Sequence, residues 1–237
     1  SEASHAIALL AWDEVSSQAA EALRLVAAGI VGQLVDSLLD PNVEFAVRRR
    51  IPRVLGSLAT QRTADGLLRG LEDRRFEVRF ECARALVRIR RASTDLRIAE
   101  ERVFGAVLRE ASVDPALWQG RQFHGWAEAP GESSFVDERL RARCNHSLEH
   151  VFTLLSLVLP SEPLRIALRG LHTEDAALRG TALEYLESVL PDRVRQALWP
   201  FLEPASAPAA RHRSREEILD ALMRSSAAIE LKLGRAD

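Results

Sequence analysis

The stretch Val47–Leu55, VRRRIPRVL, decides the fold, because its pattern returns three more times along the chain. In each copy an apolar residue precedes an arginine, and small or apolar residues then recur at helical spacing up to a final leucine. The other copies are Val78–Leu86, Leu140–Leu148 and Leu178–Leu186. Each copy therefore predicts one helix that buries one stripe of its surface.

A second match lies upstream of two copies. Leu68–Leu71 (LRGL) repeats as Leu168–Leu171, with no gap relative to the pattern that follows. Each copy thus predicts a helix, a short turn and a second helix. Such a pair cannot cover its own apolar face and must stack on the next pair. The predicted fold is all-α: an α-solenoid of about four helix pairs with flanking cap helices.

Helix pairs with this V-R-x-x-A-x-x-A-L signature resemble HEAT repeats, over roughly residues 30–203. The resemblance implies that an aspartate between the two helices pairs with the arginine of the following helix, on the neighbouring repeat. The residues of such a structural ladder would be Asp40, Arg48, Asp73, Arg79, Arg141 and Arg179. The fourth pair departs from the family pattern, because its aspartate lies closer to its arginine.

The chain is expected to divide into four segments. These are cap helices over 1–29, the repeat array over 30–203, a linker over 204–214 and a C-terminal helix over 215–237. Within the first segment, Trp12 is expected to cap the open end of the stack. In the last, Ser214 and Glu217 predict a capping box, in which a serine and a glutamate satisfy the first backbone N–H groups of a helix.

One insertion, at about 112–134, interrupts the array. It carries Trp118, Phe123 and Trp126, and loops of this length are usually functional or disordered. The aromatic residues argue against disorder. Two interpretations stay open: a patch over exposed core, which we favour, and a lid over the concave face.

Composition limits the class of protein. The chain is 47% hydrophobic and 28% charged but only 5% aromatic, which is typical of a soluble helical domain with a Leu, Ala and Val core. The two cysteines, Cys82 and Cys144, occupy core positions of the repeat, so no disulfides are expected and the cytoplasm is the predicted location. No apolar run reaches the ~20 residues that a membrane-spanning helix needs. Because the chain begins at Ser1, we interpret it as a processed or excised piece.

Charge is unevenly distributed. The net charge is −2, which argues against a general nucleic-acid binder, yet Arg48–Arg91 holds thirteen arginines against five acidic residues. These arginines could present a basic stripe to phosphate, anionic lipid or an acidic partner, or they could lie on solvated faces and in the ladder. The candidate binding residues are Arg48, Arg49, Arg50, Arg53, Arg84, Arg88, Trp118, Phe123 and Trp126.

No catalytic residues, cofactor or metal site are predicted. His146, Glu149 and His150 match H-x-x-E-H, the inverted zinc-peptidase motif, in which the histidines bind zinc. A third ligand is required, no convincing one follows, and the repeat pattern already explains this helix. We therefore interpret the match as coincidence. A metallopeptidase that used these three residues would contain stoichiometric zinc, which elemental analysis would detect.

A wider resemblance involves HSLEHVFTLLSLVLP (146–160) and LRIALRGL (164–171), followed by LRGTALEYLESVLP (178–191), LWPFLE (198–203), SREEILDAL (214–222) and IELKL (229–233). These segments are similar to soluble HEAT domains fused to bacterial ATP/ADP-carrier-like major-facilitator transporters. The similarity implies a cytosolic docking or regulatory domain that does not itself span the membrane. The expected function is a non-catalytic scaffold for a protein partner. The alternative is a nucleic-acid enzyme resembling the HEAT-like alkylpurine DNA glycosylases.

Overall fold

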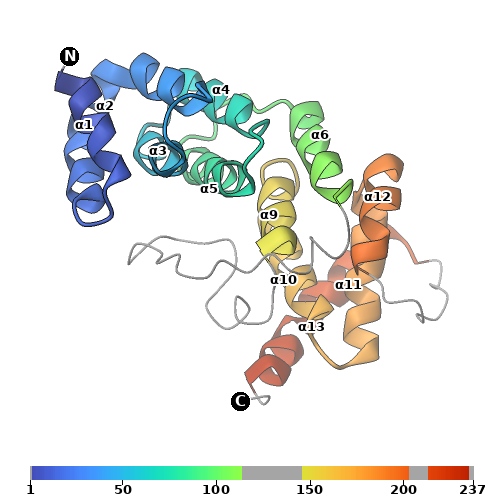
Figure 1. The fold of residues 1–237 in the computed structure, drawn as a ribbon. Coiled ribbons are helices and arrows are strands. Elements are labelled where there is room, and N and C mark those ends of the chain that lie inside the picture. The colour runs from blue at the N-terminus through green and yellow to red at the C-terminus, as the bar shows by residue number, and fades with distance from the viewer. Residues whose placement is uncertain (1, 114–145, 203–212, 235–237) are drawn as a thin grey trace. The chain divides into compact units, whose positions relative to one another are not determined.

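The structure, a computed structural model, describes residues 2–113, 146–202 and 213–234 (Figure 1). Over these ranges the chain contains eleven α-helices, one short 3₁₀ helix and no strand, which confirms the all-α class. The chain divides into two compact units, unit 1 (Ser1–Arg102) and unit 2 (Val103–Asp237).

Unit 1 is built from helices that pack in successive pairs. In chain order its elements are α1 (Glu2–Ala8), the 3₁₀ helix η1 (Leu9–Ala11), α2 (Ser16–Leu39), α3 (Phe45–Leu55), α4 (Gln61–Gly70) and α5 (Phe76–Ala92). Helix α2 contacts both α3 and α4, and α5 contacts both α3 and α4. The first helices of the two pairs therefore pack on each other, and so do the second helices. Helix α6 (Glu100–Ala111) spans the division between the units.

Helix α2 runs across the expected boundary at residue 29. A kink with non-helical backbone angles at Ile30 lies beside that boundary. Trp12, which precedes it, is 68% exposed and does not cap the stack as expected. By length and composition α2 could cross a membrane, although 33% of its most apolar window is buried in the structure; among the described helices it is the one that meets this test.

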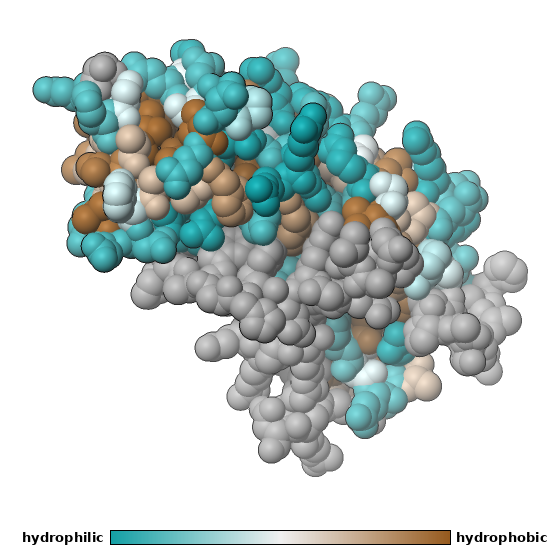
Figure 2. Space-filling view, in the orientation of Figure 1, coloured by the Kyte–Doolittle hydropathy of each residue, from teal (hydrophilic) through white to brown (hydrophobic). Residues whose placement is uncertain are grey.

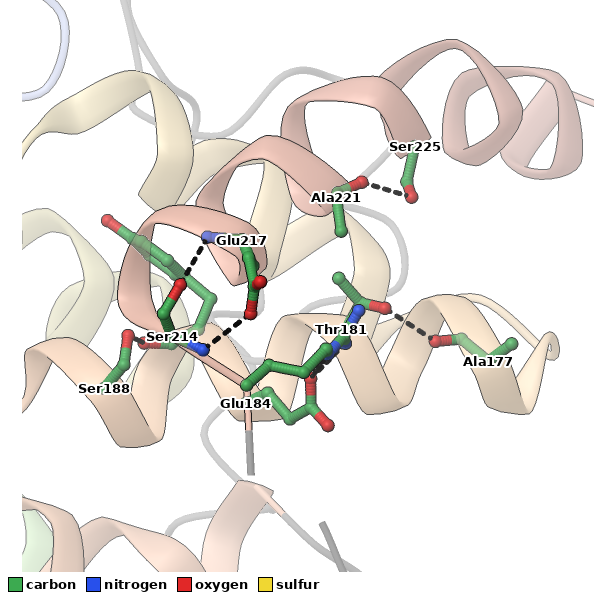
Figure 3. A network of polar contacts seen from close by, with 10 residues as sticks. Ala177, Thr181, Glu184, Ser188, Ser214, Glu217, Ala221 and Ser225 are labelled. Atoms are coloured by element: carbon green, nitrogen blue, oxygen red, sulfur yellow. Dashed lines mark hydrogen bonds and ion pairs between the residues drawn. The ribbon is translucent and has the colours of Figure 1, made fainter. Parts of the chain in front are cut away.

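Unit 2 contains α9 (His146–Leu155), α10 (Ser161–Leu171), α11 (Ala176–Val189), α12 (Asp192–Leu202) and α13 (Arg215–Gly234). Helices α10, α11 and α13 all contact one another. The predicted capping box is confirmed: the Glu217 N–H donates to Ser214 Oγ at 3.2 Å, and the Ser214 N–H donates to Glu217 Oε2 at 2.9 Å (Figure 3). Arg213 adds a hydrogen bond from Nε to Glu184 of α11 at 2.9 Å, which fastens the start of α13 to that helix.

The repeated glycines occupy equivalent places in the two units. A Cβ placed on Gly70 of α4 would lie 2.5 Å from the Cys82 Sγ of α5. A Cβ on Gly170 of α10 would lie 2.9 Å from the Ala182 Cβ of α11. Real Cβ atoms do not approach other heavy atoms this closely, so glycine is what lets the two helices of each pair meet. The LRGL repeat thus has the same packing consequence in both places.

Cys82 supplies a prediction. Its side chain is fully buried, and burial, followed by the nearby Glu81 charge, raises the pKa of the thiol well above its usual range. Because the thiolate is the reactive form, Cys82 should resist iodoacetamide at pH 8 in the folded protein and react once the protein is unfolded. Peptide mass spectrometry locates the adduct. Alkylation of Cys82 at similar rates in buffer and in 6 M guanidinium would contradict this.

Candidate interaction face

The arginines of α3 and α5 form the candidate face. Helical spacing sets Arg49 and Arg53 one turn apart on α3, and Arg84 and Arg88 one turn apart on α5. The two helices contact each other directly, so the four arginines belong to neighbouring helices. We call these four residues the arginine face. The Arg88 guanidinium approaches the end of α3, since its Nη1 would lie 3.1 Å from a Cβ on Gly56.

A buried carboxylate links the two helices within this face. Arg53 Nη2 lies 3.4 Å from Glu81 Oε1, and Arg84 Nη1 lies 3.8 Å from the same oxygen. The side chains of Glu81 and Arg84 are only 3% and 5% exposed. Two guanidinium groups therefore share one carboxylate. Sequence reasoning did not single out Glu81.

The surroundings of Arg49 disfavour its charged form. Burial, and then the neighbouring Arg50, lower the pKa of the Arg49 guanidinium, while the Asp13 charge raises it. Its guanidinium carbon lies 5.7 Å from the ring centroid of Phe45, and that of the exposed Arg75 lies 5.0 Å from the same centroid. Two cations thus flank one aromatic ring, an arrangement that favours an anion nearby.

Two other predicted binding arginines make contacts within unit 1. Arg50 donates from Nη1 to the Leu10 carbonyl oxygen at 2.5 Å and forms an ion pair with Asp13. These bonds tie α3 to the end of η1. Arg48 forms a buried ion pair with Asp73, and its Nε donates to the Leu38 carbonyl oxygen at 3.1 Å. Both side chains have an evident structural role.

The Arg48–Asp73 ion pair joins successive helix pairs. Arg48 lies on α3, in the first pair, whereas Asp73 lies between α4 and α5 of the second. Arg79 donates from Nη1 to the carbonyl oxygens of Asp73 and Arg74, at 2.8 and 3.1 Å. The turn that carries Asp73 is therefore held from both helix pairs.

The remaining predicted ladder residues differ in their contacts. Asp40 accepts hydrogen bonds from the backbone and side-chain nitrogens of Asn42, both at 2.9 Å, and its charge opposes the lowering of the Arg48 pKa by burial. Arg179 donates from Nη2 to the Leu202 carbonyl oxygen at 3.2 Å. Arg141, together with Trp118, Phe123 and Trp126, lies outside the described residues.

The H-x-x-E-H segment begins α9, where Glu149 and His150 are buried and His146 is partly exposed. His146 Nδ1 lies 3.5 Å from Glu149 Oε2, and His150 Nε2 lies 3.6 Å from Glu110 Oε1 on α6. Glu110 was not anticipated from the sequence, because nothing local marks its pairing with a helix so far along the chain. Within the described ranges, no group of three or more His, Cys, Asp or Glu side chains is placed to hold a metal ion.

Comparisons with known proteins add no assignment. No family model, curated protein or solved structure matches this chain.

Proposed function

We propose that the chain is a non-catalytic α-solenoid scaffold of HEAT-like helix pairs that binds a protein partner through an acidic segment. The partner would contact the edge of the arginine face at Arg49, together with the exposed Arg75 that lies over the same Phe45 ring. We further propose that the chain works in the cytoplasm as a domain of a larger, transporter-like protein. In that role it would hold a partner beside the protein to which it is joined.

The observation that carries the proposal is the combination of helix order and charge. First helices pack on first helices and second helices on second helices in unit 1, which is the neighbour-on-neighbour packing that repeat proteins extend into long binding surfaces. The second helices, α3 and α5, carry the arginine face, in which Arg53 and Arg84 share the Glu81 carboxylate. The helix packing and the arginines thus both support α3 and α5 as the surface that binds the partner.

The test compares two fluorescent probes of similar negative charge, a glutamate-rich peptide and a short DNA duplex, by anisotropy at low and high salt. We expect the peptide to bind, and the double variant Arg49→Glu/Arg75→Glu to bind it roughly tenfold more weakly, since rim charges contribute on the order of 1 kcal/mol. The matched control is Arg97→Glu, an exposed arginine after α5 whose backbone N–H bonds to Gln61.

Two results would overturn the proposal. Peptide binding that is insensitive to the double variant would show that the peptide does not bind at the arginine face. Tight, strongly salt-dependent binding of the duplex with none of the peptide would instead favour the glycosylase-like alternative.

A further inference from the structure

The turn that precedes α2 carries an acidic side chain that contacts two arginines of α3. Asp13 forms an ion pair with Arg50, and its Oδ1 lies 3.8 Å from Arg49 Nη2. The same carboxylate oxygen makes both contacts. Asp13 lies between η1 and α2, so α3 receives this negative charge from a turn that precedes the first helix pair.

The three side chains of this group differ in exposure. The Asp13 side chain is 83% exposed, whereas those of Arg49 and Arg50 are 25% and 13% exposed. Arg50 also donates to the Leu10 carbonyl oxygen, and the Arg49 guanidinium lies over the Phe45 ring. Both arginines therefore keep a contact within the protein if the carboxylate leaves, so the carboxylate is the exchangeable member of the group.

Releasing the Asp13 carboxylate would disturb little of the fold. The turn is at the surface, with Trp12 68% and Val15 39% exposed. Ser16 Oγ donates to the Asp13 carbonyl oxygen at 3.2 Å, a bond that holds the backbone of the turn and does not involve the carboxylate. The end of unit 1 that carries the N-terminus has hydrophilic as well as apolar residues on its visible surface (Figure 2). Rotation of the Asp13 side chain is therefore enough to open Arg49 to another anion.

The Asp13 carboxyl offers Arg49 the same charged group that an acidic partner would offer. The hydrogen bond and the charge of Arg50 lower the pKa of the Asp13 carboxyl, and the Arg49 charge adds to this effect, which outweighs desolvation. Because an aspartate ordinarily has a pKa of about 4, Asp13 is fully ionised at neutral pH. The Asp13 charge in turn raises the pKa of the Arg49 guanidinium.

We propose that Asp13 is an internal competitor of the partner's acidic segment. Its carboxylate contacts Arg49 in the unbound protein and is displaced when an acidic side chain of the partner takes its place. This inference rests on the function proposed above, because it concerns the regulation of the same site. The contact would favour partner segments dense in acidic residues, since such segments are the ones that displace Asp13 effectively.

Fluorescence anisotropy of the glutamate-rich peptide at low salt tests the competition in the full chain. We expect Asp13→Asn to lower the dissociation constant about threefold to fivefold, a range typical of exposed ion pairs. Asparagine keeps the size of aspartate and removes its charge, so the variant should fold normally, which circular dichroism checks. Asp13→Glu keeps the charge and should bind the peptide as the wild type does.

Two further variants separate contact from general electrostatics. Glu14→Gln changes the net charge of the protein equally at the neighbouring exposed residue, and it should alter the dissociation constant by less than about twofold, because charges without a direct contact are screened. In an Arg49→Met background the gain from Asp13→Asn should disappear, since the residue for which Asp13 competes is absent.

The outcomes distinguish this inference from the proposed function. If the peptide binds wild type through Arg49 and Arg75, but Asp13→Asn and Glu14→Gln change its affinity equally, the competition is refuted and the proposed function stands. A gain from Asp13→Asn that persists in the Arg49→Met background refutes the competition as well. Peptide binding by neither wild type nor Asp13→Asn would refute both proposals, whereas binding by Asp13→Asn alone would support both.

Discussion

Replacing Asp73 with alanine should lower the free energy of unfolding of unit 1 by about 3–5 kcal/mol. The Asp73 side chain is 6% exposed and that of its partner Arg48 is 11% exposed, so the variant leaves a guanidinium without its counter-charge in a place that water barely reaches. Removing one member of a buried ion pair costs far more than the pair contributes over apolar residues of similar volume. Urea unfolding, followed by circular dichroism, measures the loss.

A neighbouring carboxylate provides the control for this experiment. Glu72 pairs with Arg102 at 3.0 Å, but its side chain is 59% exposed. Glu72→Ala should therefore change the stability by less than about 1 kcal/mol. The double variant Arg48→Met/Asp73→Leu should recover most of the stability that Asp73→Ala loses. Equal effects of Asp73→Ala and Glu72→Ala would show that burial of the pair has no energetic weight.

Replacing Glu81 with glutamine should have a comparable effect, about 3–5 kcal/mol, for a different reason. Glu81 is the carboxylate that Arg53 and Arg84 share, and glutamine keeps its size while removing its charge. The variant would remove the negative charge that the Arg53 and Arg84 guanidinium groups share. The expected loss appears in the same urea experiment.

Replacing Arg84, the second arginine that contacts Glu81, tests whether Glu81 stabilises the protein through its charge or through its packing. In the Glu81→Gln background, Arg84→Met should restore part of the lost stability, because it removes one of the two opposed cations. Asp65→Asn, at an exposed carboxylate on α4 that bonds to Gln61, is the neutral control and should fall within about 0.5 kcal/mol of wild type. If Arg84→Met deepened the loss instead, Glu81 would act through packing and not through its charge.

Patterns within one element could be predicted from the sequence. Helix α12, Asp192–Leu202, can be read from the sequence, because Pro191 precedes it and its apolar residues keep helical spacing. The capping box of Ser214 and Glu217 was equally readable, since both partners lie within one turn.

Relations across elements could not be predicted in the same way. The expected boundary at residue 29 lies beside the kink at Ile30, yet α2 continues beyond it, and apolar residues on both sides of the kink are buried. Glu81 looked like one acid among many arginines, because its partner Arg53 belongs to another helix. The pairing of Glu110 with His150 likewise depends on α6 and α9 meeting, which no local pattern encodes.

The tight crossings at Gly70 and Gly170 limit how this chain can vary. Each crossing holds a fixed sum of side-chain volume, divided between a glycine and the small residue that faces it, Cys82 or Ala182. A larger residue at one position requires a smaller residue at the other, and glycine has no side chain that could be made smaller. Tolerated changes at Cys82 and Ala182 are therefore confined to residues no larger than those present. The distance between the two helices is thus fixed at each crossing, whereas the sequence elsewhere in each unit can vary more widely.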